Sequence, residues 1–367
     1  MLQLVRVLSL ASLPGNLGVS GRGVCLRALL ALALFCGVAA ARAFSLRADL
    51  VAAYYDRPGS VQAREYVPFL DGHKAVHQMM TDESFECDKP DGTCTDLKKI
   101  GITRGAVMDG VRWNDFPAVW LDRQSMPWCT GRTLRVTNND DISCIVGSLV
   151  RAVKNSDKFE KDRKWAFERP ISMRGHFGDL QFWHSMAPAG QPAKVTYERI
   201  RMRMEFAYRA SLGEFDLKSD MHAVPVAGLN RLFLRGSRRV GDLLDYNYNN
   251  HKLLTQGIAL GQMLHIAQDS FARCHVERDV HGRVLRFLSY GKQDRKTHSH
   301  FDEDDKEVAA AKSGKLNPID FGRRLLRLRA SDAKWEDVEP LVIEYFEPKD
   351  GSAQATAGKH CLNGSGT

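Results

Sequence analysis

Apolar residues recur at helical spacing along much of the chain, whereas the alternating pattern of β-strands is scarce. The segment 197–212 shows this best, because Ile200, Met204 and Ala207 fall three or four positions apart with arginines elsewhere. The pattern predicts a mostly α protein. The segments with helical spacing are 145–153, 197–212, 253–272, 319–330 and 333–346, and a shorter one begins at His73.

Residues 85–145 break this pattern with prolines, glycines and an Asn-Asp pair. Such residues favour turns and interrupt regular structure. We therefore expect long loops in this part of the chain, arranged around a buried site that the helices enclose.

The first 43 residues differ from the rest in charge, because they contain four arginines and no acidic residue. An apolar run at 28–41 is followed by Ala41, Arg42 and Ala43, which is the layout of a secretory signal peptide. The run is shorter than the roughly 20 residues of a membrane span. We expect a secreted or periplasmic protein, although an internal hydrophobic helix would have the same composition.

Removal of residues 1–43 would lower the formal charge of +8 by four. The remaining charge is modest, so it gives little support for a nucleic-acid partner. Hydrophobic residues at 44% and charged residues at 26% exclude a disordered chain and a coiled coil. We expect one helical domain at 44–347 and a flexible tail at 348–367.

Six cysteines remain after the predicted signal peptide. An even number in an exported chain favours disulfides, with buried free thiols as the alternative. The expected pairs are Cys87 with Cys94, Cys129 with Cys144 and, by elimination, Cys274 with Cys361.

The most informative polar residues lie in the apolar segment 253–272. His265 and Asp269 are four positions apart, so a helix would direct both side chains to one place. His275 comes ten positions after His265 and would point to another side if the helix continued. This spacing favours two adjacent metal sites over one.

Further histidines and acids could complete such sites, because imidazole and carboxylate groups suit zinc. His298 and Asp302 repeat the four-residue spacing, whereas we place the neighbouring His300 in a solvated acidic loop. His77 follows His73 by one helical turn, and we assign it to the helix surface or to contacts behind the ligands. The other candidate ligands are His73, Asp115, His176 and His184.

In this order, the residues resemble the zinc-dependent phospholipase C family, which shares its fold with the single-strand-specific zinc nucleases. That family has a helical H-x-x-x-D motif with a histidine six residues after the Asp, matched by His265, Asp269 and His275. A second H-x-x-x-E or H-x-x-x-D motif follows, matched by His298 and Asp302.

Three further residues extend the resemblance over roughly residues 70–305. An early histidine is matched by His73, and an Asp that precedes an HF-type loop is matched by Asp115 and His176. The sequence departs from the family in the position of its predicted N-terminus, Phe44, which lies farther from His73 than the family's spacing. This departure bears on the third zinc, which the family holds with its N-terminal residue.

The resemblance implies two or three zinc ions. One would be held by Asp115, His176, His265 and Asp269, with His184 as a competitor to His176. A second would be held by His275, His298 and Asp302, and a third by His73 with Asp269. Asp115 and Asp269 are the residues to which the resemblance assigns catalysis.

The implied activity is hydrolysis of phospholipid phosphodiesters by a monomer, with phosphatidylcholine-like lipids or a membrane surface as substrate. A single-strand-specific zinc nuclease is the alternative, and a non-catalytic, zinc-stabilised surface-binding protein is the third possibility. The basic segment 231–239 is compatible with an anionic membrane surface, with nucleic acid or with an ordinary solvated helix.

Overall fold

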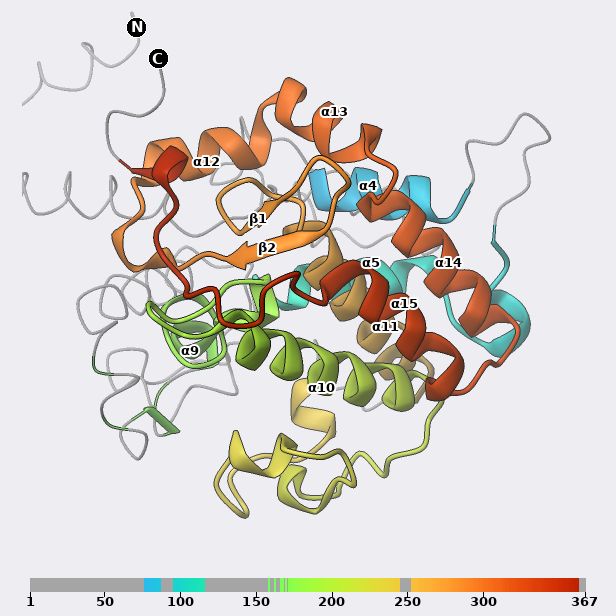
Figure 1. Ribbon diagram of the computed structural model, residues 1–367. Helices are drawn as coiled ribbons and strands as arrows, with labels where there is room; N and C mark the ends of the chain where they lie inside the picture. Colours follow the sequence, from blue (N-terminus) through green and yellow to red (C-terminus); the bar gives the residue numbers. More distant parts are fainter. Residues whose placement is uncertain are drawn as a thin grey trace, which may run out of the picture. The chain divides into compact units, whose positions relative to one another are not determined.

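The computed structural model describes residues 76–86, 95–115, 158, 162, 166–167, 169, 171–244 and 252–362 (Figure 1). This part is mostly helical, as the sequence pattern predicts, and its only sheet is a two-stranded one. Among the described helices, none is both long enough and apolar enough to cross a lipid bilayer. The predicted signal peptide, the helix at 145–153, His73 and the cysteines of the first two expected disulfides lie outside the described residues.

Two helices pack against each other at the centre, namely α5 (Arg104–Trp113) and α11 (Lys252–Asp269). Their backbones are unusually close, because both helices have glycine at the interface. A Cβ atom added to Gly261 would lie 2.0 Å from the Val107 carbonyl oxygen, and one added to Gly257 would lie 2.4 Å from the Ala106 Cβ atom. Only glycine permits this approach.

Helix α5 corrects the prediction of long loops at 85–145, because residues 104–113 of that range are helical. Thr103 caps the helix, since its side chain accepts a hydrogen bond from the Ala106 backbone N–H. The apolar residues of the helix, including Val107 and Val111, are fully buried. Packing against α11 therefore stabilises a helix that the glycines disfavour.

The remaining helices surround this pair. Helix α10 packs on α11 and α15, while α14 packs on α4, α11 and α15. The expected segments at 197–212, 319–330 and 333–346 are thus helices, with boundaries shifted by a few residues. The bounds are α4 (Val76–Ser84), α10 (Ala193–Ser211), α14 (Pro318–Ala330) and α15 (Trp335–Phe346).

After α11 the chain turns into an antiparallel pair, β1 (Val276–Arg278) and β2 (Val284–Phe287). Two more helices follow, α12 (Arg295–Glu303) and α13 (Asp305–Ser313). The segment around His300 is therefore a helix and not the predicted acidic loop, although His300 itself is exposed as expected.

The expected disulfide between Cys274 and Cys361 is confirmed. The segment after α15 returns along β2 to α12, where it is drawn in dark red in Figure 1. Its backbone forms hydrogen bonds with the residues that follow β2. The Ser289 N–H donates to the Thr356 carbonyl, and the Asp294 N–H donates to the Cys361 carbonyl. Most of the predicted flexible tail at 348–367 is therefore attached to the helical domain.

Candidate metal centre

Nine buried histidines and aspartates converge from α4, α9 (Ile171–Phe177), η5 (Gln181–His184), α11 and α12 and from the residues that follow α5 and α11. They form sets of three whose candidate ligand atoms lie within 4.8 Å of one another. We call the larger set the central group, which comprises His77, Asp115, His176, His184, His265 and Asp269. The smaller set is the His275 group, which comprises His275, His298 and Asp302.

Asp269 is the middle of the central group. Its Oδ2 atom lies 3.0 Å from His265 Nε2, which confirms that the four-residue spacing on α11 brings the two side chains together. The same oxygen lies 2.9 Å from His184 Nδ1, and the other oxygen lies 3.3 Å from His77 Nε2. The two oxygens of one carboxylate therefore face different imidazoles, which is the arrangement of a bridging ligand.

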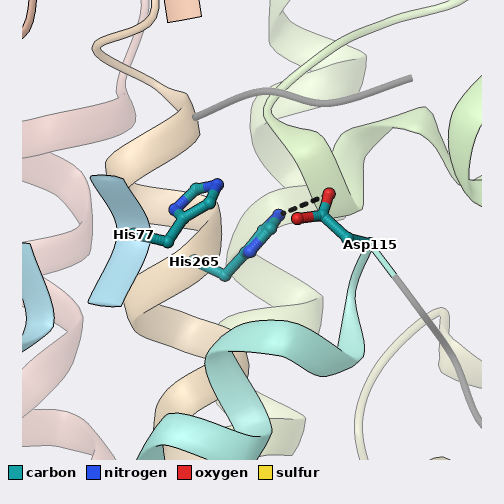
Figure 2. A group of neighbouring side chains, drawn as sticks. All are labelled: His77, Asp115 and His265. Atoms are coloured by element: carbon teal, nitrogen blue, oxygen red, sulfur yellow. Dashed lines mark ion pairs between the residues drawn. The ribbon is translucent and has the colours of Figure 1, made fainter. Parts of the chain in front are cut away.

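Asp115 follows the C-terminal end of α5. Its Oδ1 atom lies 3.7 Å from His265 Nε2, an interaction drawn in Figure 2, and 3.8 Å from His184 Nδ1. The preceding residue, Asn114, donates from its side-chain amide to the Trp183 carbonyl at 3.0 Å and to the Gln262 carbonyl at 3.3 Å. Asn114 thus joins the three segments that carry Asp115, His184 and His265.

The structure brings both of the competing histidines, His176 and His184, to the central group. Their ring centroids are 4.6 Å apart, and both have a nitrogen near an Asp115 oxygen. The turn after His184 is anchored by Ser185, whose hydroxyl donates to the Ile266 carbonyl at 2.7 Å. His176 and His184 are therefore both candidate ligands and not alternatives.

The sequence predicts His77 at the helix surface or behind the ligands, and the first of these is wrong because its side chain is fully buried. Its ring stacks on that of His265 at 4.2 Å (Figure 2). Its Nε2 atom faces Asp269. The signal was present in the sequence, since His77 shares a helix face with Val76 and Met80, which are core residues. His77 therefore brings α4 to the central group, with its Nε2 atom 3.3 Å from the Asp269 Oδ1 atom.

The His275 group forms next to the central group. His275 Nε2 lies 3.2 Å from His298 Nε2, and His298 Nε2 lies 3.1 Å from Asp302 Oδ2. We expected His275 to diverge from His265 because α11 would continue, but α11 ends at Asp269. The turn that follows is what directs His275 towards α12, so the separation into two groups holds for a different reason.

Hydrogen bonds determine which nitrogen of each key imidazole carries the proton. Carbonyl oxygens only accept, so a ring nitrogen that contacts one must be protonated. His265 Nδ1 lies 2.7 Å from the Val111 carbonyl and His275 Nδ1 lies 2.6 Å from the His184 carbonyl. In the neutral form of each ring, Nε2 is therefore unprotonated and can accept. It faces the other histidines and aspartates of the central group or of the His275 group.

His298 obeys the same rule, because its Nδ1 atom lies 2.6 Å from the Gln293 side-chain oxygen. Burial lowers the pKa of His275 to about 4 and holds the pKa of His298 well below its ordinary value. Both rings are therefore neutral at pH 7, and two Nε2 lone pairs face each other across 3.2 Å. Lone pairs at this distance repel unless a cation lies between them.

The Asp269 carboxylate of the central group is ionised. Burial would raise the pKa of Asp269, but the imidazoles of His265, His275 and His184 hold it well below its ordinary value. Burial would lower the pKa of His77, yet the hydrogen bond and the charge of Asp269 raise it. The buried groups of His and Asp can therefore hold a metal ion.

No model of a protein family matches the chain, and no curated protein or solved structure is significantly similar to it.

Proposed function

We propose that the protein is a zinc-dependent phosphodiesterase of the phospholipase C type. The observation that carries this proposal is the pair of neutral Nε2 atoms of His275 and His298, 3.2 Å apart and beside the Asp302 carboxylate. A divalent cation bound to all three side chains would turn this repulsion into coordination. Zinc suits a set of two imidazoles and one carboxylate, with an open position for water or substrate.

The central group supports a second ion and offers ligands for a third. His184, His265 and Asp269 form one set of three candidate ligands. His77 and the second Asp269 oxygen lie together at the place where a further ion would bind. The buried carboxylates of the central group agree with this interpretation, because burying a negative charge without a nearby cation costs free energy. We assign His77 the role that the resemblance gives to His73.

The two groups are neighbours, which matters for the chemistry. The His184 carbonyl accepts the hydrogen bond from His275, while the His184 ring belongs to the central group. Zinc ions in such adjacent positions supply an activated water and neutralise charge on a phosphoryl group. The protein's own contribution is to hold the imidazoles in one tautomer, to keep Asp269 ionised and to bury the ligands.

A phospholipid is the substrate we favour over a nucleic acid. The charge that remains without the predicted signal peptide is modest, and the basic segment 231–239 buries two of its apolar residues, Leu232 and Phe233. Arg235 and Leu234 are exposed on it, which suits contact with a lipid headgroup region. The nuclease and the non-catalytic zinc-stabilised protein are the competing functions.

The test is to incubate the zinc-loaded protein separately with phosphatidylcholine micelles and with single-stranded DNA. We expect a water-soluble phosphorylated headgroup together with diacylglycerol from the lipid. Asp269→Asn should abolish this product, since it removes a charge that contacts the central imidazoles. His300→Gln is the matched control, because His300 is exposed and belongs to neither group.

Nucleotide release with intact lipid would replace the phospholipase by the nuclease. Bound zinc without either product would favour the non-catalytic protein. A folded protein that binds no zinc and retains its activity in a strong chelator would refute the metal centre itself.

A further inference from the structure

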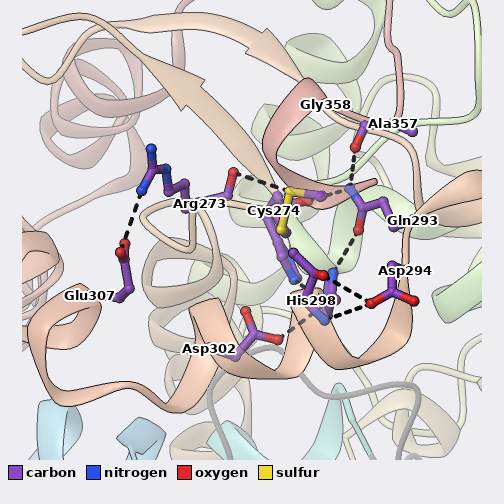
Figure 3. The surroundings of a disulfide bond; sticks show 12 residues. Arg273, Cys274, Gln293, Asp294, His298, Asp302, Glu307, Ala357 and Gly358 are labelled. Carbon is purple, nitrogen blue, oxygen red and sulfur yellow. Dashed lines mark hydrogen bonds and ion pairs between the residues drawn. A yellow bond between two sulfur atoms is a disulfide. The ribbon is translucent and has the colours of Figure 1, made fainter. Parts of the chain in front are cut away.

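Gln293 lies directly behind the His275 group and uses both ends of its amide (Figure 3). Its side-chain oxygen lies 2.6 Å from His298 Nδ1. Its side-chain nitrogen donates to the Cys274 carbonyl at 2.7 Å and to the Ala357 carbonyl at 2.9 Å. One side chain therefore connects α12, the residue before His275 and the C-terminal segment.

These contacts leave the Gln293 amide only one orientation. Both partners of the nitrogen are backbone carbonyls, which cannot donate, so the NH₂ group must face them and the oxygen must face His298. The oxygen can only accept, so His298 must carry its proton on Nδ1. The lone pair on Nε2 is then directed at His275 and Asp302, as metal binding requires.

The C-terminal segment is held where Gln293 needs it by the disulfide between Cys274 and Cys361. The Asp294 N–H donates to the Cys361 carbonyl at 2.7 Å, and the Asp294 side chain accepts from the Thr297 N–H at 2.9 Å to cap α12. The disulfide thus joins the start of the helix that carries His298 to the residue that precedes His275.

We propose that Gln293, held by the disulfide-closed segment 355–361, is a positioning residue that fixes the His298 tautomer and so sets the metal affinity of the His275 group. The proposal rests on the metal centre of the proposed function. Gln293 itself contacts no candidate metal position, because its oxygen is bonded to the Nδ1 side of the ring.

The metal experiment adds zinc or cobalt(II) to the metal-free full chain and measures the affinity of each class of site by competition with a chelator. Gln293→Leu should weaken one class of site by about 10- to 100-fold and leave the other unchanged. Gln293→Glu should lie between the wild type and Gln293→Leu, since one oxygen still accepts from His298 while the other lies against the Cys274 and Ala357 carbonyls, to which it cannot donate. A Cys274→Ala/Cys361→Ala variant should weaken the same class.

Gln191→Leu is the matched control. The Gln191 side chain is also half-buried and also bonds to a side chain, Thr196, at 2.7 Å, but it lies outside both groups. We expect wild-type affinities for it. Equal affinities of Gln293→Leu and Gln191→Leu would overturn the proposal, and so would an equal weakening of both classes of site by Gln293→Leu.

A second measurement needs no metal and separates this proposal from the proposed function. The imidazole ¹⁵N chemical shifts of the metal-free protein report which nitrogen of His298 is protonated. We expect Nδ1 to be protonated in the wild type and a mixture of tautomers in Gln293→Leu. A wild-type ring protonated on Nε2 would refute the role of Gln293, whatever the protein does with zinc.

Discussion

A single methyl group at Gly261 should separate the two helices that carry the centre. The Cβ atom of alanine would lie 2.0 Å from the Val107 carbonyl oxygen and 2.5 Å from the Val111 nitrogen, which are backbone atoms that cannot rotate away. Restoring a tolerable contact requires α5 to move by about 1 Å, since packed interiors leave no free space. The Gly261→Ala variant therefore tests the close approach of α5 and α11.

Two opposing effects determine the size of the loss. Alanine favours a helix over glycine by about 1 kcal/mol. Overpacking of a rigid interface costs about 1–3 kcal/mol and occasionally more, and with backbone atoms on the opposing side we expect the upper end. The free energy of unfolding should therefore fall by about 2 kcal/mol. The same shift would stretch the 2.7 Å contact between His265 Nδ1 and the Val111 carbonyl.

The assay is urea unfolding of the metal-free variant, followed by a zinc titration. Gly175→Ala is the control for the unfolding measurement, because an added Cβ there has no neighbour nearer than 4.0 Å and the position is also helical. The control should be neutral in stability or more stable by up to about 1 kcal/mol. If Gly261→Ala were as stable as Gly175→Ala, the inferred contact between the two backbones would be wrong.

Two further predictions concern the histidines. Because burial lowers the pKa of His275 from 6.5 to about 4, its neutral form stabilises the metal-free fold fully above about pH 6.5. This contribution of about 3 kcal/mol is lost as the pH falls towards 4. The free energy of unfolding of His275→Gln should therefore depend less on pH than that of the wild type. Equal slopes of the free energy of unfolding against pH would contradict the argument. His77→Gln should reduce the number of zinc ions bound per chain, as measured by mass spectrometry of metals, whereas His300→Gln should not; an unchanged count for His77→Gln would remove it from the centre.

The residues on one helical face were predictable from the sequence because their geometry is local. The four-residue spacing of His265 and Asp269 is a property of any helix, and the contact of 3.0 Å follows from it. The same spacing correctly paired His298 with Asp302, even though the helix that carries them was expected to be a loop.

The parts that the sequence did not predict, namely α5 and the roles of His77 and Gln293, depend on long-range packing, which local spacing does not encode. Helix α5 was missed because its glycines disfavour a helix in isolation, whereas in the fold they permit the approach of α11. His77 was placed at the helix surface or behind the ligands because its partner, Asp269, is distant in the chain. Gln293 was missed because a glutamine with no motif gives no signal until the Ala357 and Cys274 carbonyls lie beside it.

The ends of helices explain why the centre forms where it does. Val111 lies in the last turn of α5, and His184 is the last residue of η5, so their carbonyls have no partner within their own helices. Both carbonyls are satisfied by an imidazole N–H, from His265 and His275 respectively. The bonds that satisfy the backbone are therefore the ones that orient the ligands.

The same arrangement biases the centre towards cations. Helix α11 ends at Asp269 and α5 ends just before Asp115, so the C-terminal ends of two packed helices are directed at the central group. A helix C-terminus carries a partial negative charge, which adds to that of the two carboxylates and favours a positive ion. The glycine contacts that hold α5 against α11 keep these two ends together, which makes the close packing of the helices a condition for the candidate metal centre.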